Sequence, residues 1–395
     1  MQMLTSSMSG RNPLLMLPGP SQPSEDVLKA AASILPHYGP EWKKVHEEVV
    51  ELCKKLFNTS GEVILFPTPG FLAIEAGLIN LVTRKERFLM CVNGYFGEIA
   101  VRITKTHKRN VVLLEKDYGE PITPEDVEGA LEKNKDIEAA FIVYNETSTG
   151  VMNPLRDIGK VFKDHDLLVM VDAISIFGGA EINMDEWGID LCIGYASKAL
   201  GGMPGIVPIG ISRRLWKILD ERTGEPDSWY LDFRTWKKSI REMAAWGHPH
   251  PSAMPTHTVI ALREALRQVI DEGLENVYRR HKVFAAAFRN AIKAMNLQLV
   301  APEEYASPTI TVVRLPEGIP KKLIDGMLEN FNVMISGGLG KFAGKIVRVG
   351  HMGYTARKAP ISRTIAAMGY TLKTLGFNVN VDAALKAFYD SLITK

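Results

Sequence analysis

Two opposite charges follow two apolar runs near the middle of the chain. Residues 167–171 are apolar and are followed by Asp172. Residues 191–196 form a second, largely apolar run, which is followed by Ser197 and Lys198. In open α/β sheets, ligands bind outside the carboxyl ends of the strands. We therefore expect Asp172 and Lys198 to form two walls of one pocket, although either charge alone would often be a solvated loop residue.

A lysine in such a pocket can act as a nucleophile toward carbonyl groups. Loss of hydration lowers the pKa of an amine below its ordinary value of about 10.4. A carboxylate that faces the amine is either a simple salt-bridge partner or the group that holds the ring nitrogen of pyridoxal phosphate protonated. The second of these readings predicts pyridoxal 5'-phosphate as the cofactor, with Lys198 forming the Schiff base and Asp172 on the ring nitrogen.

Other strand ends supply candidates for holding the rest of this cofactor. A phosphate group needs backbone N–H groups at a helix N-terminus, and Pro69, Gly70 and Phe71 stand where a helix follows the first strand. Phe96 and Ile174 are the candidates to pack on the two faces of the ring. Taken alone, each motif would also fit an ordinary turn or a core side chain.

Hydroxyl groups and one arginine complete the set of candidates. Thr147 and Ser148 lie at the end of another strand and could bind the phenolic oxygen of the ring, although both residue types are common in turns. Arg348 interrupts an apolar strand, where an inward-facing guanidinium is costly unless it is paired. Its planar shape suits a substrate carboxylate. The alternative is an arginine that faces outward.

A loop rich in histidine and proline offers a weaker possibility. His248, His250 and His257 lie close together in the sequence. A zinc site there would lack a nearby cysteine or acidic ligand, so we predict no metal. The three cysteines, Cys53, Cys91 and Cys192, have neither metal nor redox spacing, and we expect buried thiols in a reducing, cytoplasmic compartment.

The composition is that of an ordinary globular protein. The 395 residues are 46% hydrophobic and 23% charged, with a formal net charge of +2. This small net charge gives no reason to expect binding to nucleic acid or to a membrane surface. No apolar run approaches the roughly 20 residues of a membrane span, and the polar first residues lack the apolar core of a secretory signal.

Strand and helix patterns alternate through the first half of the chain. We expect strands at 63–66, 87–92, 111–114, 139–144, 167–171, 191–196 and 206–211, with helices between the first five of them. This alternation predicts an α/β fold whose large domain has a mostly parallel, seven-stranded sheet between helices.

The pattern changes after residue 229, which indicates a second domain. Long helices are expected at 258–271 and 275–295, followed by short strands near 297–300, 309–313 and 346–349. We predict an N-terminal arm at residues 1–20, a large cofactor-binding domain at 21–265 and a smaller α+β domain at 266–395.

With these motifs in hand, the chain resembles the class V aminotransferases of the fold-type I pyridoxal-phosphate superfamily. Within that family it is most similar to the serine–pyruvate and alanine–glyoxylate aminotransferases. The likeness covers nearly the whole chain, and its most specific parts are ETSTGVMNPL, LVMVDAISIFGG, YASKALGGMPG and GKIVRVGHMG.

The resemblance implies a role for each main candidate residue. Lys198 would be the Schiff-base lysine, Asp172 the partner of the ring nitrogen, and Phe96 the stacking aromatic residue. Thr147 would lie near the ring oxygen, and Arg348 would bind the substrate carboxylate.

The resemblance also implies a homodimer with its active sites at the subunit boundary. The loop equivalent to residues 248–256 would reach the phosphate of the neighbouring subunit. In that loop His250 and Ser252 are the nearest matches to the tyrosine and the Thr-Pro pair of the family.

The chain departs from the family at the phosphate. Pro69, Gly70 and Phe71 stand where Ser-Gly-Thr or Ser-Gly-His is common, and Ser197 stands where glutamine often precedes the lysine. A related group that uses pyridoxamine itself as the amino donor also has an unusual phosphate turn, so this group remains an alternative.

The expected activity is transamination from serine or alanine to a 2-oxo acid, pyruvate or glyoxylate, with ping-pong kinetics. Lys198 would act as general base and acid. The alternatives are a pyridoxamine–pyruvate aminotransferase, a pyridoxal-phosphate lyase or desulfurase, a homologue without turnover, and a nicotinamide-dependent dehydrogenase. A desulfurase would require a cysteine on a mobile loop, and we expect none of the three cysteines to lie in such a loop.

Overall fold

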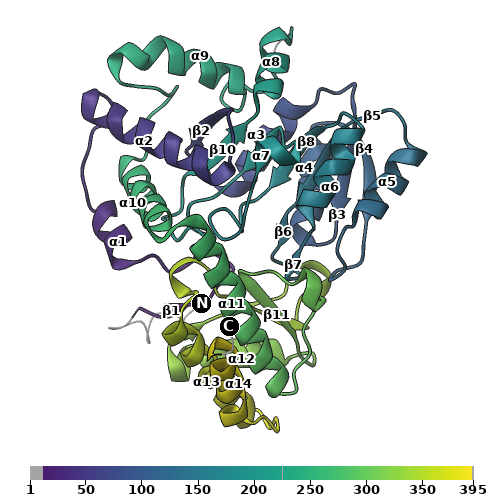
Figure 1. The fold of residues 1–395 in the computed structure, drawn as a ribbon, viewed down its shortest axis with the longest axis vertical. Coiled ribbons are helices and arrows are strands. Elements are labelled where there is room, and N and C mark those ends of the chain that lie inside the picture. The colour runs from purple at the N-terminus through teal and green to yellow at the C-terminus, as the bar shows by residue number, and fades with distance from the viewer. Residues whose placement is uncertain (1–11, 225, 394–395) are drawn as a thin grey trace.

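A seven-stranded sheet forms the centre of the larger part of the molecule (Figure 1). The computed structural model describes residues 12–224 and 226–393. In sheet order the strands are β2 (Glu62–Phe66), β10 (Val207–Ile211), β9 (Leu191–Ile193), β8 (Leu168–Asp172), β5 (Ile137–Val143), β3 (Arg87–Val92) and β4 (Asn110–Glu115). In this sheet β10 runs opposite to the other six strands, which are parallel to one another. The predicted α/β fold with a mostly parallel sheet is therefore confirmed.

Helices cover both faces of this sheet, and each face has its own apolar core. One face packs against α2 (Pro40–Phe57), α5 (Pro124–Lys133), α6 (Leu155–Asp164), α7 (Met184–Trp187) and α10 (Thr256–Glu272). The other packs against α3 (Gly70–Leu81), α4 (Tyr95–Thr106), α8 (Arg213–Glu221) and α9 (Phe233–Met243). Strand side chains alternate between the two cores: Val169 and Val171 of β8 join the first, and Met170 joins the second.

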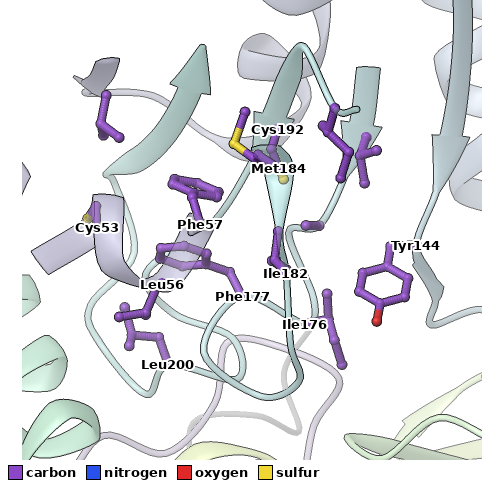
Figure 2. Close-up of a cluster of buried hydrophobic side chains, with 14 of the residues drawn as sticks. Cys53, Leu56, Phe57, Tyr144, Ile176, Phe177, Ile182, Met184, Cys192 and Leu200 are labelled. Carbon is purple, nitrogen blue, oxygen red and sulfur yellow. The ribbon is translucent and has the colours of Figure 1, made fainter. Parts of the chain in front are cut away.

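The loops that follow β8 and β9 are anchored in the first of these cores. Phe177, five residues after Asp172, packs on Phe57 of α2 with 4.5 Å between ring centroids. Leu200, two residues after Lys198, is buried in the same cluster (Figure 2). The two charged strand ends are thus held by apolar side chains close to them in the sequence.

The C-terminal part is a smaller α+β unit, also as predicted. Its sheet consists of β11 (Ile310–Arg314), β14 (Ile346–Gly350) and β13 (Ser336–Gly337), all antiparallel. The helices are α11 (Leu274–Ala294), α12 (Ile319–Phe331), α13 (Lys358–Thr374) and α14 (Val381–Ile393). They enclose a separate apolar core.

The N-terminal segment belongs to both parts of the molecule. Strand β1 (Leu14–Leu15) pairs in parallel with β12 (Val333–Met334), so that the start of the described chain lies beside the C-terminal helices (Figure 1). Helix α1 (Glu25–Ala31) then packs against α10.

One strand prediction was wrong, one strand is shorter than predicted, and two predictions stay open. The strand expected at 191–196 ends at Ile193, so that Lys198 lies in the loop that follows it. Residues 297–300 form a single bridge between Leu299 and Val313 instead of a strand. The pairing stops because Pro302, which has no N–H group to donate, leads into a short 3-10 helix, Glu303–Tyr305. The predicted boundary at residue 265 falls inside α10, and the domain limits stay a prediction. Residues 1–11 of the predicted arm lie outside the described residues.

The Phe57–Phe177 contact gives a stability prediction. We expect Phe177→Ala to lower the free energy of unfolding by about 3–5 kcal/mol, because it leaves a cavity under the loop that follows Asp172. Urea unfolding followed by circular dichroism would measure this loss. Ile393→Ala, at a side chain that is 81% exposed, is the control and should change little. Equal effects of the two substitutions would contradict the prediction.

Candidate active site

A cavity of about 190 Å³ opens at the carboxyl ends of β5, β8 and β9. Asp172 is the last residue of β8, and Lys198 follows the neighbouring strand β9. Both side chains line this cavity, together with Gly70, Phe71, Phe96, Val143, Asn145, Thr147, Ile174, Ser175 and Tyr195. The two charges therefore share one cavity because β8 and β9 are adjacent and parallel.

The cavity wall contains residues that the sequence analysis singled out and others that it missed. The candidates Gly70, Phe71, Phe96, Thr147 and Ile174 are in the wall, whereas Pro69, Ser197, His250, Ser252 and Arg348 are not. The missed polar residues are Asn145, Ser175 and Tyr195. Each of them lies within three residues of a candidate, so proximity to a strand end was the available signal.

Asp172 is a buried carboxyl group with a single backbone partner. Its Oδ1 accepts a hydrogen bond from the N–H of Ile174 at 2.9 Å. Burial raises the pKa of Asp172 to about 7, and the Glu146 charge adds to this rise, while the Ile174 N–H and the Lys198 charge oppose it. A cationic N–H group placed against Asp172 would restore its negative charge.

Lys198 shows the opposite shift. Burial lowers the pKa of its amine to about 8, with the Arg348 charge adding to the effect and the Asp172 charge opposing it. The amine donates a hydrogen bond to the carbonyl oxygen of Pro18 at 2.8 Å. About a tenth of the amine is therefore unprotonated at pH 7, against less than about a thousandth at its ordinary pKa, and this fraction can act as a nucleophile or a general base.

Arg348 lies in the middle of β14 and is 7% exposed. Its Nε donates to the carbonyl oxygen of Gly337 at 2.7 Å. Burial lowers the pKa of Arg348 to about 10, and the Glu146 charge opposes this change. Because its charge also lowers the pKa of Lys198, the guanidinium lies within electrostatic range of the cavity.

Glu146 is a buried residue that orients Phe96. Its Oε2 accepts hydrogen bonds from the N–H groups of Phe96, at 3.1 Å, and Gly97, at 3.2 Å. Its Oε1 accepts from the hydroxyl and the N–H of Ser148. A Cβ at Gly94, the N-cap of α4, would overlap the Glu146 side chain. Glu146 thus replaces the missing cap of α4 and fixes the helical turn that carries Phe96.

The first turn of α3 forms another side of the cavity. Pro69 is the N-cap and makes no side-chain cap. The N–H groups of Gly70 and Phe71 stand where a helix has no internal acceptors. A Cβ at Gly70 would come within 3.0 Å of Ile174 Cδ1, so the glycine allows this turn to approach Ile174 closely.

The loop at residues 248–256, which contains His248 and His250, is held by hydrogen bonds within the same chain. Trp42 Nε1 donates to His250 Nε2 at 3.0 Å, and His250 Nδ1 lies 2.6 Å from the carbonyl oxygen of Ser252. Both ring nitrogens of His250 are therefore engaged, and burial lowers its pKa to about 3. The Ser252 hydroxyl lies 3.3 Å from the Tyr230 hydroxyl. Contact of His250 or Ser252 with a partner subunit stays a prediction.

Within residues 12–224 and 226–393, no three His, Cys, Asp or Glu side chains gather in a way that could hold a metal ion. No helix in these ranges is long and apolar enough to cross a membrane. Cys53, Cys91 and Cys192 are free and buried, and burial raises the pKa of each thiol. The cytoplasmic location stays a prediction.

Comparison with known proteins identifies the family. The sequence profile described as "Aminotransferase class-V" matches residues 21–358. The chain belongs to the class V aminotransferase family. Members of this fold-type I family use pyridoxal phosphate, so the family implies this cofactor for the present aminotransferase.

Three relatives illustrate the range of activities in the family. An uncharacterized aminotransferase of Methanocaldococcus jannaschii is 36% identical over 93% of this chain and 94% of its own. The serine–glyoxylate aminotransferase of Methylorubrum extorquens is 31% identical over 87% of both chains. The crystal structure of pyridoxamine–pyruvate aminotransferase from Mesorhizobium loti superposes with a TM-score of 0.90 at 26% identity, covering 97% of this chain and 98% of the other. At these identities the family is shown and the substrates are not fixed.

The environment of Lys198 predicts its titration in the cofactor-free protein. Its reaction with trace acetic anhydride, followed by peptide mass spectrometry, should have a midpoint near pH 8. Asp172→Asn should lower this midpoint further, because the carboxylate charge favours the protonated amine. Lys321, whose pKa is raised by Asp325, is the internal control. A Lys198 midpoint near the ordinary value of 10.5 would contradict the prediction.

Proposed function

We propose that this aminotransferase transfers the amino group of serine or alanine to pyruvate or glyoxylate by a ping-pong mechanism. The observation that carries the proposal is the shared cavity of Asp172 and Lys198, in which burial raises the pKa of the acid and lowers the pKa of the amine. The serine–glyoxylate relative supports a small amino donor and a 2-oxo acid acceptor.

The residues in the cavity fit the ring of pyridoxal phosphate. A flat aromatic ring suits the apolar side chains of Phe96 and Ile174, which line the cavity. Asn145 Oδ1 is buried without a hydrogen-bond partner and lines the same space, so it could accept a hydrogen bond from a bound polar group. We infer that Asp172 holds the ring nitrogen and that Thr147 lies near the ring oxygen.

The chain's own groups would carry out the proton transfers. Pyridoxal phosphate, when bound, supplies an electron sink for the negative charge that develops on the substrate. Lys198 would hold the cofactor through its ε-amino group and, once freed, would move the proton of the substrate α-carbon. Its pKa of about 8 suits both taking up and returning that proton near neutral pH. Arg348 would bind the substrate carboxylate and so aim the α-carbon at Lys198.

The phosphate would lie against the first turn of α3. The N–H groups of Gly70 and Phe71, after the N-cap Pro69, would donate to it, and the positive end of the helix dipole favours an anion. Ser197, just before the lysine, and Ser252 or His250 from a second subunit are the proposed further contacts. Since His250 has no free ring nitrogen in the described chain, Ser252 is the better supported of these two.

Exposed apolar side chains support the proposed homodimer. Tyr38, Phe71, Trp229 and Trp246 are between 47% and 74% exposed, and Ile34 is 92% exposed. Phe71 lines the cavity itself, and the backbone next to Tyr38 is bonded to that of Trp246, since Gly39 N–H donates to the Trp246 carbonyl oxygen at 3.4 Å. A second copy that covers these side chains would place a subunit boundary next to the cavity.

A second candidate is a pyridoxamine–pyruvate aminotransferase. It is supported by the TM-score of 0.90 to such an enzyme and by the phosphate turn, in which no hydroxyl side chain caps α3. A lyase or desulfurase has less support, because burial raises the pKa of all three cysteine thiols and leaves no thiolate near the cavity.

The proposed reaction predicts exchange of amino groups that depends on Lys198. Protein loaded with pyridoxal phosphate should form alanine from serine and pyruvate, measured by chromatography of the amino acids. We expect Lys198→Ala to reduce the rate by about 10²–10⁴-fold, because it removes the proton-transfer group. A panel of other amino acids serves as the comparison. Failure of serine and alanine in a panel where another donor reacts would overturn the substrate assignment.

Loss of the arginine should act mainly on substrate binding. We expect Arg348→Gln to raise the KM for the amino donor by about 10–100-fold, which corresponds to the loss of charge-assisted hydrogen bonds to a carboxylate. A donor amine that lacks the carboxylate should react equally with both proteins. Steady-state kinetics would separate KM from kcat, and an unchanged KM would contradict the role of Arg348.

The two candidate functions differ in what the phosphate contributes. If the first turn of α3 binds the phosphate, pyridoxal phosphate should bind about tenfold more tightly than pyridoxal. Absorbance titration of the purified protein would measure both affinities. Equal affinities, together with conversion of free pyridoxamine and pyruvate, would favour the second candidate.

A further inference from the structure

Residues 16–21 form a strap between the C-terminal part and the loop that carries Lys198. At the C-terminal part, Met16 N–H donates to the Met334 carbonyl oxygen and Gly350 N–H donates to the Met16 carbonyl oxygen, both at 2.9 Å. The Met16 side chain is fully buried in the core of that part. This end of the strap is therefore fixed to β14, two residues beyond Arg348.

The other end of the strap is bonded to the lysine and its backbone. Ser21 N–H donates to the Ser197 carbonyl oxygen at 2.9 Å, and the Ser21 hydroxyl donates to the Lys198 carbonyl oxygen at 2.6 Å. The Pro18 carbonyl oxygen accepts from the Lys198 amine at 2.8 Å. The strap thus contacts both the main chain of Lys198 and its side-chain amine.

Two glycines allow these contacts, and each leaves no space for a side chain. A Cβ at Gly19 would overlap Nζ, Cε and Cδ of Lys198. A Cβ at Gly350 would overlap the carbonyl group of Leu17. Gly19 also has a φ of +128°, a conformation that other residues rarely adopt. The strap therefore passes in direct contact with the amine on one side and with β14 on the other.

The path from β14 to the amine is short. Met16, which binds Gly350, and Pro18, which binds the amine, are two residues apart in the sequence. Two residues span at most about 7 Å. Because so few residues separate the two contacts, a displacement of the strap at Gly350 must also displace the Pro18 carbonyl oxygen.

We propose that the strap is a positioning element that sets the Lys198 amine relative to Arg348. It acts through Lys198 and rests on the proposed function, in which these two residues hold the cofactor and the substrate. The Pro18 carbonyl oxygen fixes one direction of the amine, and the bonds of Met16 tie that carbonyl to the strand of the arginine. The six residues of the strap thereby set the distance between the Lys198 amine, which transfers the proton, and the Arg348 guanidinium, which binds the carboxylate.

The test is a substitution on the far side of the strap. Gly350→Ala, in the full-length protein, should weaken the binding of pyridoxal phosphate by about tenfold, because it pushes Leu17 and displaces the strap, whose Ser21 holds the main chain of the lysine that bonds to the cofactor. Gly326→Ala is the matched control. Its Cβ would come within 2.7 Å of Thr371 Cγ2 in the same part of the molecule, and Gly326 does not touch the strap. Absorbance titration should show a change of less than about twofold for this control.

A milder variant keeps the test decisive if Gly350→Ala fails to fold. Ser21→Ala removes only the hydroxyl that holds the Lys198 carbonyl oxygen and should weaken cofactor binding by about threefold to tenfold. Equal effects of Gly350→Ala and Gly326→Ala, or no effect of Ser21→Ala, would overturn the proposal.

A second readout separates failure of the strap from failure of the proposed function. If the wild-type protein does not bind pyridoxal phosphate at all, the proposed function fails. The strap is then tested in the cofactor-free protein by the acetylation midpoint of Lys198. We expect Ser21→Ala and Gly350→Ala to shift this midpoint and Gly326→Ala to leave it unchanged. An unshifted midpoint in Ser21→Ala and Gly350→Ala would overturn the proposed role of the strap.

Discussion

The site depends on two opposite charges that are withdrawn from water, one at the end of β8 and one in the loop that follows β9. Burial disfavours both charges, which raises the pKa of Asp172 to about 7 and lowers the pKa of Lys198 to about 8. Their mutual attraction opposes both shifts. The result is an acid and an amine that both titrate near neutral pH inside one cavity, an arrangement that suits proton transfer.

Much of the surrounding structure keeps these two groups in place. Phe177 and Leu200 anchor the loops after β8 and β9 in the apolar core on one face of the sheet (Figure 2). Glu146 holds the start of α4 and thereby Phe96. The strap ties the Lys198 amine to the C-terminal part, which contributes Arg348. Each anchor is a buried apolar contact or a hydrogen bond to main chain, so the geometry is set before any ligand enters.

The sequence was informative where the signal is local. Apolar runs that end in single charges located β8, β9, Asp172 and Lys198, and the alternation of patterns predicted the sheet. The engagement of His250 by Trp42, 208 residues away, could not be read from a local pattern. The same holds for the contact of Pro18 with Lys198, 180 residues apart, because only the folded chain brings such segments together.

The most direct test of the central claim is the identity of the lysine that bonds to the cofactor. Protein saturated with pyridoxal phosphate would be reduced with borohydride, digested and mapped by mass spectrometry. We expect one stoichiometric modification, on Lys198. Modification that is spread over exposed lysines such as Lys321, with Lys198 unmodified, would contradict the assignment of the cavity as the active site.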